Sequence, residues 1–193
     1  WWRALSASLG VGLFLLLSGR LKTDWILSRR KLYLLGGMVA IHWICFFGSI
    51  KLANASAALI CFATISSFTA IVQPWITGRK RETHEIVFGL MVIPGIVLIA
   101  GRAQGDVLMG IVLGITAALL LAIFSSYEKK WIHEVDPEHM TLLQMTGAWL
   151  TMCVCISGEK LFFGLDRFVP SGQDFIYLLI LGLVCTCVAW VLC

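Results

Sequence analysis

His42 is the residue with the clearest chemical potential, and it lies in the middle of a long apolar stretch beside Trp43. If that stretch crosses a bilayer, an ionisable side chain at this depth is costly and should face a bundle interior or a wet cavity. An imidazole there could contact a solute or relay a proton, because its charge changes near neutral pH. It could equally be a neutral group that hydrogen-bonds a neighbouring helix. The sequence leaves both interpretations open.

Hydroxyl side chains follow in the next apolar stretch. Thr64 and Ser67 lie on one face of a predicted helix, together with Ile71. Hydroxyls on such a face can line a solute path or bond a neighbouring helix. They can also bond the carbonyl one turn earlier in their own helix, and this structural interpretation is favoured.

Two prolines predict kinks in the apolar stretches. Pro74 follows Gln73, and Pro94 precedes Gly95. Proline removes a helical hydrogen bond and clashes with the preceding turn, so a helix bends there. These kinks could serve as gating hinges or be features of packing.

Motifs of enzymes and of metal sites are missing from the sequence. It holds no His-Glu-x-x-His, no Gly-x-Ser-Gly, no aspartate-rich motif and no phosphate-binding glycine loop with a lysine. The pairs Cys153/Cys155 and Cys185/Cys187 are spaced i, i+2, which directs the two thiols to well-separated helix faces. We therefore expect no catalytic residue, no bound metal and no cofactor.

The elements that must position these residues follow from composition. The chain has 193 residues, of which 59% are hydrophobic and 13% are charged. Soluble domains are about 45–50% apolar and about 25% charged. The charges cluster in short segments separated by gaps of roughly 16–23 residues, the length that crosses about 30 Å of hydrocarbon as a helix. The net charge of +4 comes from loops between apolar stretches, so nucleic-acid binding is not expected.

Seven apolar spans can be drawn, over residues 2–18, 32–50, 55–77, 86–101, 107–127, 141–157 and 175–193. Peptide groups find no water in hydrocarbon, so each span must be a helix or part of a closed barrel. The spans lack the alternation of barrel strands. The sequence therefore predicts an all-α polytopic membrane protein with about seven transmembrane helices, embedded in the lipid of the inner or plasma membrane.

Basic residues indicate how these helices are oriented. Ten of the 15 Lys and Arg residues fall in the first, third and fifth loops, and five fall on the other side. The richer side should be cytoplasmic, which places the first residue outside. Helices that start outside normally follow an earlier helix, so we expect the chain to be a fragment of a longer protein.

A face of small residues is predicted to bring helices close together. Gly110 and Gly114 are spaced i, i+4 and are followed by Ala117 and Ala118. Such faces let helix backbones approach closely in membranes. We expect this face to pack helices within the chain, with a homodimer as an alternative.

A faint internal repeat links the first span to the sixth and the second to the seventh. Leu-Leu-Leu-Ser18-Gly19 ends the first span, and Val-Cys-Ile-Ser157-Gly158 ends the sixth. The matched spans are five helices apart. An odd repeat length inverts the second copy in the membrane, an arrangement that many transporters use.

Gly48 to Gly101 carries a family resemblance. It contains Lys51-Leu-Ala-Asn54-Ala-Ser56, then Gln73-Pro74-Trp-Ile-Thr-Gly78-Arg79-Lys80, and then Pro94-Gly95 in a glycine-rich span. A basic and small-polar end of one helix, a proline near the cytoplasmic end of the next, and a basic loop resemble the drug/metabolite transporter superfamily, EamA-like branch. Gln73 stands where many members carry an acidic residue, which argues against proton coupling at this position.

The resemblance implies a ten-helix bundle of two inverted five-helix repeats. Residues 1–102 would be the first EamA-like repeat without its first helix. Residues 107–193 would be the second repeat without its last two helices. The resemblance covers essentially the whole chain and agrees with the orientation expected from the charges.

We therefore expect a permease that moves a small metabolite or drug across the membrane by alternating access. The expected cavity residues are His42, Trp43, Thr64, Ser67, Gln73 and Trp190, and the expected hinges are Pro74, Pro94 and Gly95. The substrate could be an amino acid, a nucleotide-sugar-like metabolite or a drug. An intramembrane enzyme with His42 as base and a non-transporting assembly protein are the alternatives.

Overall fold

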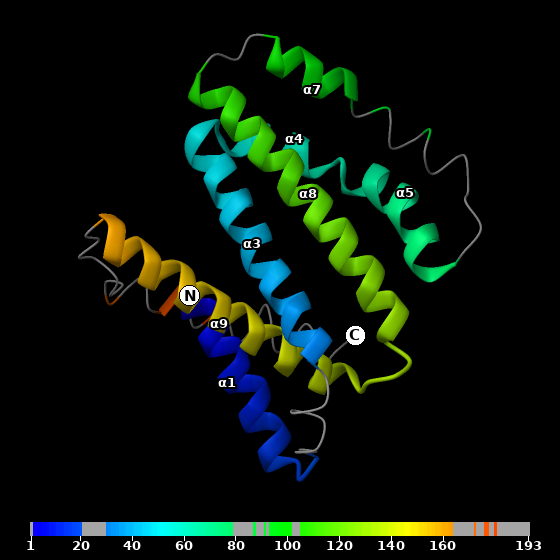
Figure 1. Cartoon of the computed structure of the whole chain (residues 1–193), viewed down its shortest axis with the longest axis vertical. Helices are drawn as coiled ribbons and strands as arrows, with labels where there is room; N and C mark the ends of the chain where they lie inside the picture. The colour runs from blue at the N-terminus through cyan, green and yellow to red at the C-terminus, as the bar shows by residue number, and fades with distance from the viewer. Residues whose placement is uncertain are drawn as a thin grey trace. The chain divides into compact units, whose positions relative to one another are not determined.

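All regular elements among the described residues are helices. The structure, a computed structural model, describes residues 2–20, 30–78, 93–101 and 105–163, with isolated positions at 87, 91, 172, 176, 177 and 180. In chain order the helices are α1 (Trp2–Leu17), α3 (Arg30–Leu52), α4 (Ala55–Phe62), α5 (Ile65–Thr77), α7 (Ile93–Ala100), α8 (Asp106–Trp131) and α9 (Pro137–Phe163) (Figure 1). The all-α prediction is confirmed for this part of the chain.

Four segments among these residues are long and apolar enough to cross a membrane, namely Arg30–Leu52, Ala55–Thr77, Asp106–Trp131 and Pro137–Ser157. They match four of the seven predicted spans and support a helical membrane protein. Helix α1 is apolar but has 16 residues, fewer than the about 20 that a bilayer core requires. Helix α7 is the described helix within predicted span 86–101, and predicted span 175–193 lies outside the continuously described residues.

The chain forms two compact units, and the first comprises Trp1–Ala40 and Ile132–Cys193. In its described part α1 packs on α9. The face of α1 that becomes buried consists of Ala4, Ala7, Ser8, Val11 and Leu15. Its outer face exposes Leu9, Leu13, Leu16 and Leu17. A helix that is apolar on its exposed face as well as its buried face suits a lipid surrounding.

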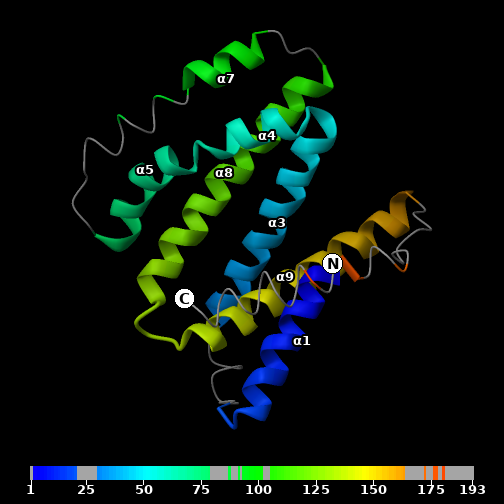
Figure 2. The same ribbon diagram turned by 180° about the vertical axis from the view of Figure 1, so that it is seen from behind.

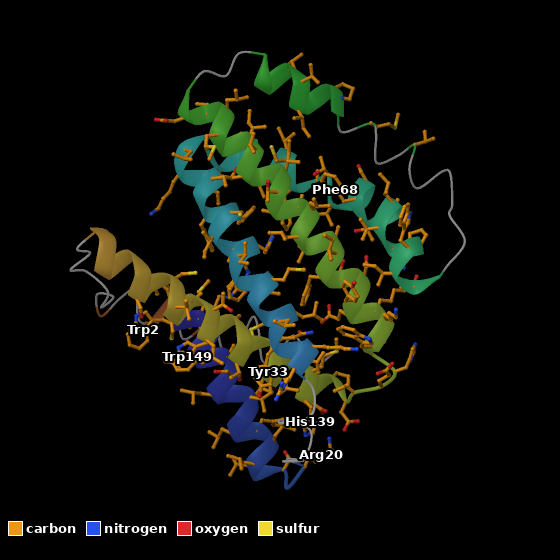
Figure 3. All side chains as sticks on the ribbon, in the orientation of Figure 1. Trp2, Arg20, Tyr33, Phe68, His139 and Trp149 are labelled. Carbon is orange, nitrogen blue, oxygen red and sulfur yellow. The ribbon has the colours of Figure 1, made fainter. Side chains whose placement is uncertain are left out.

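Helices α1 and α9 run antiparallel in this unit. Gly12 lies against Leu142, and Arg20, just after α1, has its Nη1 3.6 Å from Glu138 Oε1 in the first turn of α9. Figure 3 labels Arg20 and, one residue after Glu138, His139 at this end of the unit. The end of α1 and the beginning of α9 are therefore neighbours.

The second unit, Ile41–Trp131, is built along α8. Helices α4 and α5 pack along α8, and α7 packs on α4 (Figures 1 and 2). The buried face of α8 includes the small residues Gly110, Gly114, Ala117, Ala118 and Ala122. This confirms the prediction that the face packs helices within the chain.

Two glycines of α8 allow the neighbouring helices to lie close to its backbone. A Cβ on Gly110 would lie 2.8 Å from Ala53 Cβ, and one on Gly114 would lie 2.8 Å from Cys61 Cβ and 2.9 Å from Ser49 Oγ. Since Ala53 follows α3 and Ser49 precedes its end, the contacts also show that α3 and α8 run antiparallel. Methyl groups at these glycines would overlap the neighbouring helices.

Predicted span 55–77 is divided into α4 and α5. Asn54 caps α4, because its Oδ1 accepts a hydrogen bond of 2.8 Å from Ala57 N. Gly78 ends α5 with a φ of +72°, a conformation that glycine adopts without strain. Between the two helices the chain turns at Ala63–Thr64. The span therefore consists of two helices joined by a short turn of right-handed backbone, and Ala55–Thr77 as a whole keeps the length needed to cross a membrane.

Candidate functional site

The candidate site lies in the second unit and is centred on His42. The side chain is 5% exposed, and its Nδ1 lies 2.8 Å from the backbone oxygen of Ala117 on α8. A carbonyl oxygen can only accept, so Nδ1 carries the hydrogen and donates it. In the neutral ring, Nε2 is then the hydrogen-bond acceptor. This contact fixes the tautomer of the imidazole.

Two phenylalanine rings hold the plane of the imidazole. Phe46, one turn further along α3, stacks on His42 at 6.1 Å between centroids with 20° between the planes. Phe62, at the end of α4, lies 5.8 Å from His42 and 5.1 Å from Phe46. Aromatic contacts of this kind contribute beyond their buried area. Contributions from α3, α4 and α8 together orient His42.

These residues lie at similar depths in their spans. His42 is near the midpoint of the 23-residue α3, and Ala117 is near the midpoint of the 26-residue α8. The turn at Ala63–Thr64 is within one helical turn of the midpoint of Ala55–Thr77. If the spans cross a bilayer, the site is near its midplane, where a polar side chain is most costly.

Thr64 lies in the turn between α4 and α5 and hydrogen-bonds within it. Its backbone N–H donates to Cys61 O at 3.1 Å, three residues back instead of four. Its Oγ1 donates to the same oxygen at 2.6 Å. The Thr64 hydroxyl, which was predicted to line the cavity, therefore donates a hydrogen bond that stabilises the turn. This supports the structural interpretation of Thr64.

Buried polar atoms of this unit without a hydrogen-bond partner among the described residues include Ser49 Oγ, Ser67 Oγ and Gln73 Nε2. Ser67 and Gln73 were predicted cavity residues, and both belong to α5. Ser49 was missed, although it shares a helix face with His42 and Phe46 through the spacing i, i+4, i+7. Buried polar groups without a protein partner require water or a ligand.

The remaining predicted residues are dispersed. Trp43 is half-buried beside His42 on α3, and Pro74 lies inside α5, which continues to Thr77. Pro94 and Gly95 are exposed in the first turn of α7, where a proline needs no N–H partner. Trp190 lies outside the described residues. The break between α4 and α5 lies at Ala63–Thr64, and the bend predicted at Pro74 stays a prediction.

Within the described ranges no three His, Cys, Asp or Glu side chains gather as a metal site would require. The groups around His42 are a backbone carbonyl, aromatic rings and, further along the same face, a hydroxyl. Such a set can hydrogen-bond and stack against a solute. Within the part of the chain that the structure describes, the observed contacts of His42 include no charged side chain.

Comparison with protein-family models, with curated proteins and with solved structures finds no match to this chain. What the structure supports by itself is a helical membrane protein, on the four apolar segments of spanning length. Its function must be inferred from the chemistry of the site.

Proposed function

We propose that this protein is a secondary transporter of the drug/metabolite type, which moves a small polar solute across the cytoplasmic membrane by alternating access. The observation that carries the proposal is the buried, oriented imidazole of His42 at mid-span. Its Nδ1 donates to the backbone carbonyl of Ala117, so Nε2 is the atom that accepts a hydrogen bond from the solute.

The interrupted helix beside His42 supports a transport site. Discontinuous helices near the midplane form the binding sites of many secondary transporters, because irregular backbone is tolerated in a bilayer only where it is buried in protein or lines a cavity. Phe62, which touches His42, is the last residue of α4 before the turn. The unpartnered hydroxyls of Ser49 and Ser67 add polar groups that water or a solute can satisfy.

The antiparallel pairing of α1 and α9 supports the inverted five-plus-five repeat. These helices correspond to the first and sixth spans, which the repeat pairs as equivalents. Equivalent helices next to a twofold axis in the membrane plane pack antiparallel, as α1 and α9 do. Four further spans separate Arg20 from Glu138, and an even number of crossings returns the chain to the same side. The contact between these two residues agrees with a cytoplasmic location for both loops.

Transport is tested in proteoliposomes that contain the protein expressed from its complete gene. Uptake of labelled amino acids, nucleotide-sugar-like metabolites and drugs is compared with uptake by protein-free vesicles. At least one class is expected to enter faster, and His42→Ala is expected to reduce that uptake at least tenfold. Ile44→Ala, at an exposed position of the same helix, is the matched control.

Two results would remove this proposal. Uptake at the level of protein-free vesicles for every class would contradict transport and return attention to an enzyme or an assembly protein. Full uptake by a folded His42→Ala variant would leave transport in place and remove His42 from the site.

A further inference from the structure

A second polar position lies in the first unit, where the beginning of α3 crosses α9. Gly36 faces the backbone of α9 so closely that an added Cβ would overlap the carbonyl oxygen of Gln144. Gly147 in turn faces α3, and its added Cβ would overlap the carbonyl oxygen of Tyr33. Figure 3 labels Tyr33 at this crossing. The two glycines therefore bring backbone against backbone, which leaves no room for water between them.

The side chain of Gln144 is enclosed at this crossing. It is 0% exposed, and within the described part of the chain neither its Oε1 nor its Nε2 has a hydrogen-bond partner. Gln144 lies near the middle of the candidate span Pro137–Ser157, away from the interfaces. A buried amide with both ends unsatisfied destabilises the arrangement that buries it.

The hydroxyls nearest to Gln144 along α9 do not satisfy it. Thr141 Oγ1 donates to Pro137 O at 2.9 Å, Thr146 Oγ1 donates to Leu142 O at 2.7 Å, and Thr151 Oγ1 donates to Gly147 O at 2.9 Å. All three hydroxyls are used within their own helix. A glutamine that served to join helices would bond its neighbour, so a purely adhesive role does not account for this side chain.

We propose that the α3–α9 crossing is a gate over Gln144, closed in this structure, which opens to admit an uncharged polar group to the amide. The amide presents a donor beside an acceptor, so its ligand is water or a solute with the complementary pair, such as a carboxamide. The glycine contacts close the gate tightly, and the unsatisfied amide favours its opening. This inference rests on the proposed transport function and adds a second polar position to it.

Opening is measured by the rate at which a thiol at position 141 reacts with N-ethylmaleimide. Thr141 is fully buried one turn before Gln144, and cysteine matches its size. The reporter Thr141→Cys is introduced into the complete protein after its native cysteines are replaced by alanine. Ser18→Cys, at an exposed position, controls for the reactivity of the reagent.

Two variants move the gate in opposite directions. Gln144→Leu keeps the volume and removes the unsatisfied amide, so labelling at position 141 should slow about tenfold or more. Gly36→Ala forces the backbones apart, so labelling should accelerate about tenfold or more. Gly147→Ala tests the same contact from α9 if Gly36→Ala does not fold. Labelling at position 18 should stay within about twofold in every variant.

Equal labelling rates at position 141 in the parent and in Gln144→Leu would overturn the gate, as would faster labelling in Gln144→Leu. The rates do not depend on transport, so they separate this inference from the proposed function. If the parent transports none of the solute classes but labelling responds as expected, the gate stands and the transporter assignment fails. If uptake is normal and labelling does not respond, the transporter assignment stands and the gate fails.

Discussion

Gly114 offers the sharpest test of how the second unit is packed. The change to test is Gly114→Ala, which adds one methyl group to the buried face of α8. Its Cβ would lie 2.8 Å from Cys61 Cβ and 2.9 Å from Ser49 Oγ. These neighbours belong to α4 and α3, and Cys61 Cβ is attached directly to the backbone of α4. A helix must therefore shift to accept the methyl group.

The magnitude follows from a comparison with Gly48→Ala. Gly48 lies in α3 of the same unit, and its added Cβ would meet only Leu113 Cδ1, at 3.1 Å. That methyl belongs to a flexible side chain and can move by a few tenths of an ångström. Both variants gain about 1 kcal/mol of helix propensity, which cancels in the comparison. The overlap at Gly114 costs about 1–3 kcal/mol, so Gly114→Ala should be less stable than Gly48→Ala by about that amount.

The assay is equilibrium unfolding in mixed detergent micelles, followed by circular dichroism, for the two variants and the parent. A double variant, Gly114→Ala with Ser49→Ala, removes one of the two overlapping atoms and should recover part of the loss. Equal free energies of unfolding for Gly114→Ala and Gly48→Ala would refute the packing of α3, α4 and α8 described above. Loss of stability in both to the same extent would have the same consequence.

Three further predictions concern single contacts. His42→Asn keeps a donor toward the carbonyl of Ala117 and should retain most of the stability while losing uptake. His42→Gln keeps an acceptor in place of Nε2 but loses the bond to α8, so its free energy of unfolding in micelles should fall by up to about 1 kcal/mol. Asn54→Ala removes the cap of α4 and should lower the free energy of unfolding by about 1 kcal/mol, whereas Asn54→Ser should restore it. Arg20→Ala should lower the free energy of unfolding by no more than about 1 kcal/mol, because the Arg20 side chain is 66% exposed, and the difference should shrink in 1 M salt. A loss of several kcal/mol would contradict the assignment of this contact as a weak surface ion pair.

The spanning helices could be located from the sequence because apolar length is a local property. The observed Arg30–Leu52 and Asp106–Trp131 contain the predicted spans 32–50 and 107–127 in full. Their ends extend past the apolar residues to charged ones, which a helix can carry into the interface. The small-residue face of α8 was also visible in the sequence, because its spacing of four residues needs no knowledge of the partner helix.

The interruption of Ala55–Thr77 could not be located in this way. The sequence predicted a bend at Pro74, which lies inside α5, whereas the interruption between α4 and α5 lies at Ala63–Thr64. No glycine or proline marks the turn. It is stabilised by the two hydrogen bonds of Thr64 to Cys61 O and by the packing of Cys61 against Gly114. Packing of this kind depends on α8, which lies far along the chain.

The sequence by itself determined that the chain is helical, that its apolar stretches are long enough to span a bilayer, and that His42 lies at mid-span. Only the tertiary structure decided which atoms meet these polar groups. The partner of His42 is a carbonyl 75 residues away, whereas Gln144, which the sequence did not single out, is enclosed without a partner in the described part of the chain. The length of an apolar span, and the position of a residue within it, depend only on residues that are neighbours in the sequence. A hydrogen bond requires two atoms within about 3 Å, and how the helices cross sets that distance.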